Sequence, residues 1–363
     1  MDFFNSIEIN KKNLIDNLKT IKNKAKNKKI CAMVKANAYG HDLKTVVLTL
    51  KNNVDFFGVA NTEEALKIRN YAYKNKILLC GAYNKDKLKN LILNKISLTV
   101  FSFFQLKEIL KECKIVKEKA YLHIKINTGM NRLGIKNIKS LKVMLNFINK
   151  NNNYLILEGV FSHLFNSESK ELSNSQYLKF INFIKNIKNL NCINIHFENS
   201  RGLFNNVDYL NICNMVRVGI SLYGLEIENE KLKPVLSVKS QIIEIQKVNE
   251  EEYVGYGKTI IERDGRVAIL PLGYADGILR NYKNNYVYVN DKPCKIINVC
   301  MDMILVDITN VNSKVGDVVT VISNDNKKLN SVSFISKNVN TISYEIVTNL
   351  NHNRFNLNIL EAL

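Results

Sequence analysis

The feature that most constrains the fold is a repeated alternation between residues 30 and 220. Eight short runs of apolar and β-branched residues recur there, and longer segments with helical periodicity separate them. The runs cover residues 30–34, 56–60, 77–80, 98–101, 121–126, 157–161, 192–196 and 215–220. Strands that alternate with helices form parallel sheets, and eight such units favour a closed α/β barrel, the TIM-type (β/α)8 fold. An open parallel sheet is the alternative.

The segments between these runs carry helix signals. Helices are expected at 42–50, 62–73, 105–116, 138–148 and 176–187. The second of them has a clear start, because Asn61 can cap it and Glu63 and Glu64 lie in the first turn, where the helix dipole favours acids. The spacing therefore predicts βα units.

The pattern of the sequence changes after about residue 230. Alternating apolar runs now follow one another with turn signals at 290–291 and 316–317 and few helical stretches. The predicted strands are 235–248, 267–272, 286–289, 294–299, 304–308 and 318–322. We expect two domains, a barrel over residues 1–230 and a second, mostly β domain over residues 231–363.

Composition excludes several classes of protein. The chain is 46% hydrophobic, but no stretch approaches the roughly 20 apolar residues of a transmembrane helix, and its start lacks the basic and apolar segments of a secretory signal. Its seven cysteines are scattered, without a Cys-x-x-Cys pair. We therefore expect a soluble, cytoplasmic protein with no disulfide framework and no metal site.

The formal net charge of +19 raises the alternative of a nucleic-acid-binding protein. The lysines are spread along the whole chain, however, while arginine is scarce and no nucleic-acid-binding motif accompanies them. A solvated basic surface explains the charge better. We expect neither nucleic acid nor a membrane as a partner.

The most informative segment is residues 34–41, with the sequence VKANAYGH. It places Lys35 at the carboxyl end of the first predicted barrel strand, where barrels of this type carry their chemistry, with no acid following before Asp42. Burial without a counter-charge favours the neutral amine, which can form an imine with a carbonyl group. A lysine that only extends from a strand end into solvent is the alternative.

Residues 34–41 resemble the pyridoxal-phosphate attachment motif of the alanine racemases, and other segments match this family in the same order along nearly the whole chain. The resemblance implies an isomerase that uses pyridoxal 5'-phosphate to interconvert L- and D-alanine, supplying D-alanine for peptidoglycan. It also implies that Lys35 holds the cofactor covalently and that Tyr39 contacts its phosphate. Asp42 departs from the family, in which glycine is frequent.

Residues 123–132, with the sequence HIKINTGMNR, resemble the family segment whose arginine contacts the cofactor and the substrate carboxylate. The resemblance gives Arg132 this role. Strand alternation places Lys125 where it can point into the barrel beside Arg132. Two adjacent cations repel, and we hypothesise that Lys125 is carbamylated by carbon dioxide, as is frequent in the family. Asn127 stands where aspartate is common.

Three more segments match the barrel half of the family. They are FSH at 161–163, NIHFENS at 194–200 and MVRVGISLYG at 215–224. The resemblance implies that His163 belongs to a hydrogen-bond chain near the cofactor and that Ser200 binds the phosphate. It also implies that Arg217 bonds the pyridine nitrogen, while backbone N–H groups of Gly219 and Ile220 cradle the phosphate.

The second domain carries the remaining matches. They are VGYGKT at 254–259, PLGYADG at 271–277, VCMD at 299–302 and ISYE at 342–345. The resemblance makes Tyr256 the second catalytic base, opposite Lys35, and places Tyr274 and Met301 at the substrate and Tyr344 in the cofactor pocket. An ordinary phenol is protonated at neutral pH, so Tyr256 needs cationic neighbours.

In the family, Tyr256, Tyr274 and Met301 serve the active site of the other subunit, so the resemblance implies a homodimer. Other substrates, as in the serine or broad-specificity racemases and related decarboxylases, are an alternative, as is a catabolic role. A non-catalytic pyridoxal-phosphate carrier is a further one, although it would lack the second domain. The tail from 349 to 363 matches the family less clearly.

Overall fold

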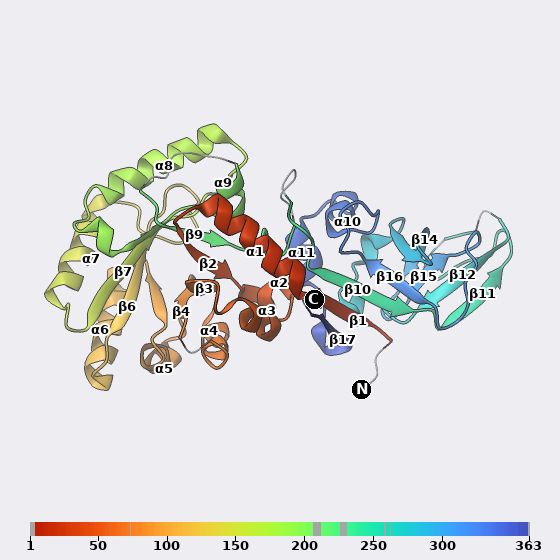
Figure 1. Cartoon of the computed structure of the whole chain (residues 1–363), viewed down its shortest axis with the longest axis horizontal. Helices are drawn as coiled ribbons and strands as arrows, with labels where there is room; N and C mark the ends of the chain where they lie inside the picture. The colour runs from red at the N-terminus through yellow and green to blue at the C-terminus, as the bar shows by residue number, and fades with distance from the viewer. Residues whose placement is uncertain are drawn as a thin grey trace. The chain divides into compact units, whose positions relative to one another are not determined.

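The computed structural model describes residues 4–72, 74–205, 212–225, 231–257, 259–261 and 263–361. The chain divides into two compact units (Figure 1). We call residues Leu18–Ala38 and Asp42–Leu222 the barrel unit, and the other described residues the sheet unit.

In the described part of the barrel unit, eight parallel strands close into a barrel. They are β2 (Lys29–Met33), β3 (Phe56–Val59), β4 (Lys76–Leu79), β5 (Ser97–Val100), β6 (Ala120–Lys125), β7 (Leu155–Phe161), β8 (Asn194–His196) and β9 (Met215–Val218). The barrel closes because β2 pairs with both β3 and β9. The predicted (β/α)8 barrel is confirmed, and each apolar run forms one of its strands.

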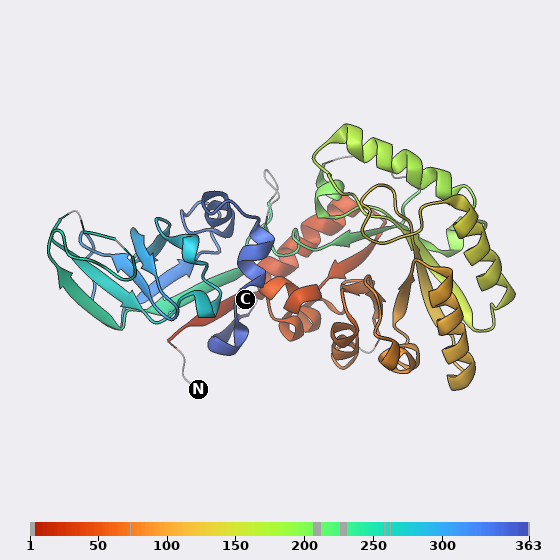
Figure 2. The same ribbon diagram turned by 180° about the vertical axis from the view of Figure 1, so that it is seen from behind.

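Helices follow the strands and cover the outside of the barrel (Figures 1 and 2). They are α3 (Leu43–Leu50), α4 (Thr62–Arg69), α5 (Leu88–Leu93), α6 (Phe103–Val116), α7 (Ile138–Lys150), α8 (Lys170–Ile184) and α9 (Ser200–Phe204), with short 3-10 turns η1 (Lys85–Lys87) and η2 (Leu190–Cys192). Asn61 caps α4 by accepting the Glu64 N–H, as predicted. Helix α8 begins earlier than expected because Ser169 caps it.

Among the described residues of the sheet unit, nine strands form one sheet in the order β11-β12-β15-β14-β13-β16-β10-β1-β17. Their bounds are β1 (Ser6–Asn10), β10 (Leu236–Gln241), β11 (Glu244–Val248), β12 (Gly265–Leu270), β13 (Tyr286–Val289), β14 (Lys292–Val299), β15 (Ile304–Asp307), β16 (Val318–Ile322) and β17 (Asn356–Leu360). The predicted turn at Asn290 and Asp291 joins β13 to β14, with φ of 48° and 60°. The mostly β second domain is confirmed.

The first strand belongs to a different unit from the one in which the sequence placed it. Strand β1 lies in sequence within the expected barrel domain, yet it pairs antiparallel with β10 and parallel with β17 in the sheet unit. Its partner β17 lies in the tail that matched the family less clearly. The boundary between the two domains was predicted after residue 230. Residues 226–230, just before it, lie outside the described residues.

A long helix, α1 (Lys11–Ala25), follows β1. The remaining elements are short helices and 3-10 turns. They are α2 (Lys35–Gly40), α10 (Val332–Asn338) and α11 (Ser343–Thr348), with 3-10 turns η3 (Tyr274–Asp276), η4 (Arg280–Tyr282) and η5 (His352–Arg354). Over the ranges described above, none of the helices combines the length and apolar character needed to cross a membrane.

Candidate functional site

The carboxyl ends of the barrel strands bring together most of the predicted barrel residues. Lys35 follows β2, Lys125 ends β6, His163 follows β7 and Arg217 lies in β9. Because all these strands are parallel, their carboxyl ends surround one mouth of the barrel.

Lys35 begins a turn with unusual backbone geometry. The residues of α2 after Lys35 all have positive φ, from 51° at Asn37 to 74° at Gly40, so the turn is left-handed. A left-handed helix costs roughly 1–2 kcal/mol for each L-residue. Backbone hydrogen bonds offset part of this cost: Ala38 N–H donates to Val34 O at 2.9 Å, and Ala36 N–H to the Glu64 carboxylate at 2.7 Å. Strain of this kind is typical of functional sites.

The end of this turn belongs to the sheet unit, where Tyr39 lies among aromatic rings. Its ring centroid is 5.1 Å from that of Tyr223 and 5.7 Å from that of Tyr344. The backbone packs closely here as well, since a Cβ on Gly40 would lie 1.9 Å from the Val347 carbonyl oxygen. The structure therefore brings together Tyr39 and Tyr344, which lie far apart in sequence.

Lys125 is a buried lysine with cationic neighbours. Its side-chain nitrogen lies 5.4 Å from the centre of the Phe161 ring. Burial lowers the pKa of Lys125 to about 8, and the nearby positive charges of Arg132, Arg217 and Lys35 contribute to the decrease. The surroundings of Lys125 thus favour a neutral amine.

The Arg217 guanidinium makes several hydrogen bonds inside the barrel. One guanidinium nitrogen lies 2.7 Å from His196 Nδ1 and also donates to the His196 carbonyl at 3.1 Å. The other donates to the carbonyl of Ser162 at 2.7 Å and lies 3.2 Å from His163 Nδ1. These contacts fix the position of the buried guanidinium.

The His163 imidazole is neutral because it is buried beside cations. Burial lowers its pKa well below the ordinary value, and Arg217, Arg132 and other cations add to the effect. Since the guanidinium only donates hydrogen bonds, the His163 Nδ1 that faces it is an acceptor and Nε2 carries the proton. Ser162 does not pair with His163 but bonds Thr128, with 2.8 Å between the two hydroxyl oxygens.

Ser200 lies under backbone N–H groups that follow β9. Its hydroxyl oxygen accepts from Gly219 N–H at 3.0 Å and from the Ser221 hydroxyl at 2.9 Å, and Ser221 N–H approaches it to 3.4 Å. Sequence reasoning named Gly219 and Ile220 but not Ser221. Successive N–H groups that converge in this way are suited to an anion such as a phosphate.

In the sheet unit, Tyr256 projects from a loop with its side chain 67% exposed. Gly255 and Gly257 on either side have φ of 71° and 82°, a conformation that favours glycine. The Asn298 amide donates to the Tyr256 carbonyl at 2.7 Å and holds the loop against β14. Sequence reasoning missed Asn298, which carries no motif of its own.

Tyr274 and Met301 lie next to each other. Tyr274 N–H donates to the Cys300 carbonyl at 3.1 Å, and Ala275 N–H donates to the Met301 carbonyl at 2.9 Å. Because Asn298 also holds the Tyr256 loop, the segment from Asn298 to Met301 connects Tyr256, Tyr274 and Met301. Their side chains are largely solvent-exposed in the single chain.

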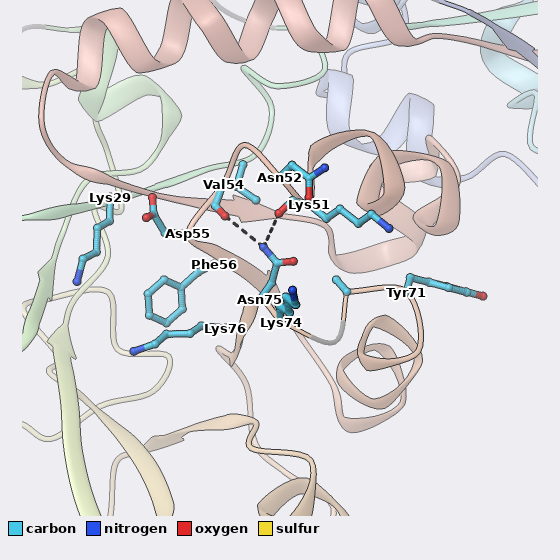
Figure 3. A pocket seen from close by; sticks show the side chains of 11 residues that line it. Lys29, Lys51, Asn52, Val54, Asp55, Phe56, Tyr71, Lys74, Asn75 and Lys76 are labelled. Atoms are coloured by element: carbon cyan, nitrogen blue, oxygen red, sulfur yellow. Dashed lines mark hydrogen bonds between the residues drawn. The ribbon is translucent and has the colours of Figure 1, made fainter.

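Within the barrel unit, a cavity of about 620 Å³ lies at the amino ends of the strands, opposite the mouth that carries Lys35, Lys125 and Arg217. It is lined at the amino ends of the strands by Lys29, Phe56 and Lys76, and Asn75 bonds two backbone carbonyls beside it (Figure 3). Barrels of this kind carry their chemistry at the carboxyl ends. We therefore assign the candidate site to the mouth with Lys35.

Two family models match this chain, one for each half. Residues 9–227 match the family model "Alanine racemase, N-terminal domain", and residues 235–357 match "Alanine racemase, C-terminal domain". Together the two matches cover nearly the whole chain.

Individual relatives agree with the family models. The chain is 38% identical over 335 residues to an alanine racemase of Fusobacterium nucleatum, covering 88% of this chain and 91% of the relative. It is 36% identical over 361 residues to one of Borreliella burgdorferi, covering 95% and 94%. A solved alanine racemase structure from Clostridium difficile superposes with a TM-score of 0.92 at 31% identity, covering 99% of this chain and 96% of that one.

Proposed function

The chain belongs to the alanine racemase family, a family of isomerases, and from this premise we propose that it interconverts L- and D-alanine. The observation that supports this activity best is the position of Lys35. It follows a barrel strand and begins a strained turn, and its charge acts on Lys125 together with those of Arg132 and Arg217. An amine in such surroundings is suited to hold a carbonyl cofactor and to accept a proton.

We propose pyridoxal 5'-phosphate as the cofactor, because the donors present fit its charged groups. The Ser200 hydroxyl accepts from Gly219 N–H and from the Ser221 hydroxyl, so its own proton is available to a phosphate, and the buried Arg217 offers a hydrogen bond to a ring nitrogen. Tyr39 and Tyr344 are proposed to complete the pocket. When bound, the cofactor supplies an electron sink that stabilises negative charge at the substrate Cα.

Two residues of the chain would move the proton. Lys35 Nζ is proposed to take it from one face of Cα, and Tyr256 Oη to serve the opposite face, so that each group alternates between base and acid. Arg132 and Met301 are proposed to hold the substrate carboxylate, with Tyr274 at the entrance. His163 is proposed to link Arg217 to the tyrosine by hydrogen bonds.

We propose that the active enzyme is a homodimer in which Tyr256, Tyr274 and Met301 complete the site of the partner subunit. These side chains are 67%, 43% and 56% exposed in the single chain. A proton-transferring phenol works best where water is excluded. A second copy of the chain, by covering this surface, would provide such a site.

The direct test of the activity follows the optical rotation of pure L-alanine after addition of the protein and pyridoxal phosphate. The signal is expected to fall to zero as the D-enantiomer forms. Parallel reactions with serine and lysine test the substrate, and alanine is expected to react fastest. A much slower rate with alanine than with either of the other two would contradict the proposal.

We further propose that Lys125 is carbamylated. Its pKa of about 8 leaves a large neutral fraction at that pH, and the neutral amine is the form that adds to carbon dioxide. The resulting anion would relieve the repulsion from Arg132.

With 13C-bicarbonate at pH 8, we expect a carbamate signal in the NMR spectrum. The signal should weaken about two pH units lower, where the ammonium form dominates. It should be absent from Lys125→Gln at every pH and unchanged in Lys119→Gln, which replaces an exposed lysine before the same strand. Loss of the signal in both variants, or in neither, would refute the assignment.

The cellular role is proposed to be supply of D-alanine for peptidoglycan, in the cytoplasm. The cysteines of the described chain are all free thiols, as is usual in a reducing compartment. Deletion of the gene should make growth depend on added D-alanine, and unaffected growth would argue against this role.

A further inference from the structure

Buried polar side chains form a continuous chain across the interior of the barrel. It starts at Arg217, whose guanidinium lies 2.7 Å from His196 Nδ1. His196 Nε2 then lies 2.8 Å from His123 Nδ1, and His123 Nε2 lies 3.3 Å from a carboxylate oxygen of Glu158. All four residues are buried, with exposed fractions between 0% and 8%. Apolar side chains would fill this space at a lower desolvation cost, so the presence of these four polar side chains requires an explanation.

The donors in this chain can point in only one direction. A guanidinium has no acceptor, so the Nδ1 of His196 that faces it must be unprotonated. His196 then carries its proton on Nε2 and donates it to Nδ1 of His123. His123 in turn carries its proton on Nε2 and donates it to Glu158. The two imidazoles are neutral, because burial lowers the pKa of both.

The backbone is arranged to bring Glu158 to the end of the chain. The pairing of β6 with β7 shifts register here: Leu122 pairs with Leu157, but His123 pairs with Gly159, so Glu158 forms a β-bulge. A bulge redirects a side chain that would otherwise follow strand alternation. Gly159 makes room for the imidazole, because a Cβ there would lie 2.4 Å from His123 Nδ1.

Glu158 is also held from the far side. Ser97 donates to the same carboxylate oxygen at 2.5 Å, and Lys76 Nζ lies 2.6 Å from the other oxygen. Lys76 stands beside Phe56 in the wall of the cavity at the amino ends of the strands (Figure 3). Burial alone raises the pKa of Glu158, but hydrogen bonds from His123, Lys76 and Ser97 outweigh it and hold the pKa below its ordinary value. Glu158 is therefore a carboxylate.

The groups that hold the Arg217 guanidinium directly carry no charge. Within the described ranges, the groups that accept hydrogen bonds from its guanidinium are backbone carbonyls and neutral imidazoles. The nearby acid Glu198 pairs with Lys28 at 2.8 Å. A hydrogen-bonded path thus links the Arg217 guanidinium to a carboxylate at the other end of the barrel.

We propose that Glu158 is a positioning residue for Arg217: through the fixed tautomers of His123 and His196, it orients the guanidinium. The effect of Glu158 on catalysis rests on the proposed function. The order of the protons in the chain does not, and it can be measured in the protein alone.

The test is 15N NMR of histidine-labelled protein, which reports which ring nitrogen carries the proton. The chain has only five histidines, and replacing His41, His163 and His352 singly assigns the remaining signals to His123 and His196. We expect both to be neutral with the proton on Nε2. A proton on Nδ1 of either ring, or a charged ring, in the wild-type protein would overturn the proposal without any variant.

Variants of Glu158 then test its role. In Glu158→Gln the amide oxygen should turn to the Lys76 ammonium and present the NH2 group to His123, which removes the acceptor for Nε2–H. We expect the single tautomer of His123 and His196 to be lost. In the double variant Glu158→Gln with Lys76→Met, the amide oxygen is free to face His123, and the wild-type tautomers should return. The matched control is Glu108→Gln, which removes an acid paired with Lys85 elsewhere in the barrel unit.

Racemisation provides the second readout. We expect Glu158→Gln to lower the rate roughly 10- to 100-fold, the usual effect of a lost hydrogen bond to a charged group, and the double variant to regain part of it. Wild-type imidazole signals in folded Glu158→Gln would refute the positioning role. If the wild-type protein racemises no amino acid, the proposed function fails, while the tautomers still decide the present proposal.

Discussion

A Lys35→Ala variant is expected to lose racemisation to below detection. Without the amine, the chain has no group at this position to hold pyridoxal phosphate covalently and none to serve one face of Cα. Reduction with borohydride followed by mass measurement should add the cofactor to the wild-type chain but not to the variant. The visible absorbance of the bound cofactor should change in parallel.

The matched control for this variant is Lys44→Ala. Lys44 is an exposed lysine on α3, the helix that follows the left-handed turn. Its replacement should leave both the rate and the mass increment unchanged. A Lys35→Ala protein that still carries the increment would show that another lysine holds the cofactor, and the site assignment would then be wrong.

Tyr256→Phe is expected to have the second largest effect. Loss of one proton-transferring group usually costs about 10²- to 10⁴-fold in rate, and here it should slow racemisation in both directions. Lys35 remains, so exchange of the Cα proton with deuterated water should persist for one enantiomer only. Retained exchange without racemisation would identify Tyr256 as the second base.

Tyr253→Phe provides the control, since Tyr253 is also 67% exposed and precedes Tyr256 by three residues. It should racemise alanine at nearly the wild-type rate. Mixing Lys35→Ala and Tyr256→Phe subunits under conditions of exchange should restore activity, because a mixed dimer contains one site without either defect. A Tyr256→Phe enzyme with the wild-type rate would refute the two-base mechanism.

The strands of the barrel were predictable because they are largely buried on both faces and most of their residues are apolar. Residues 286–289 and 318–322 of the second unit matched their predicted bounds because turn residues border them. Strand β1 was not predicted. It is short, and its partners in the sheet lie more than 200 residues later in the chain, a distance that local patterns do not report.

The candidate site shows a similar division. The motif around Lys35 was recognisable from its residues, and so was the cap of α4. The left-handed turn was not, because four of the five residues after Lys35 are not glycine, and their conformation depends on packing. Glu158 was missed for a related reason. Strand alternation predicts the direction of a side chain only where the register is regular, and a bulge is set by the neighbouring strand.

The position of β1 between β10 and β17 has a consequence for synthesis on the ribosome. The barrel strands lie between Lys29 and Val218, so all of them emerge before the first partner of β1 does. At about 5–20 residues per second, β1 waits on the order of ten seconds or more for β10, and longer for β17. An unpaired strand can join another nascent chain during this time, but β1 is only five residues long and carries Glu8 between its two isoleucines, features that limit such pairing.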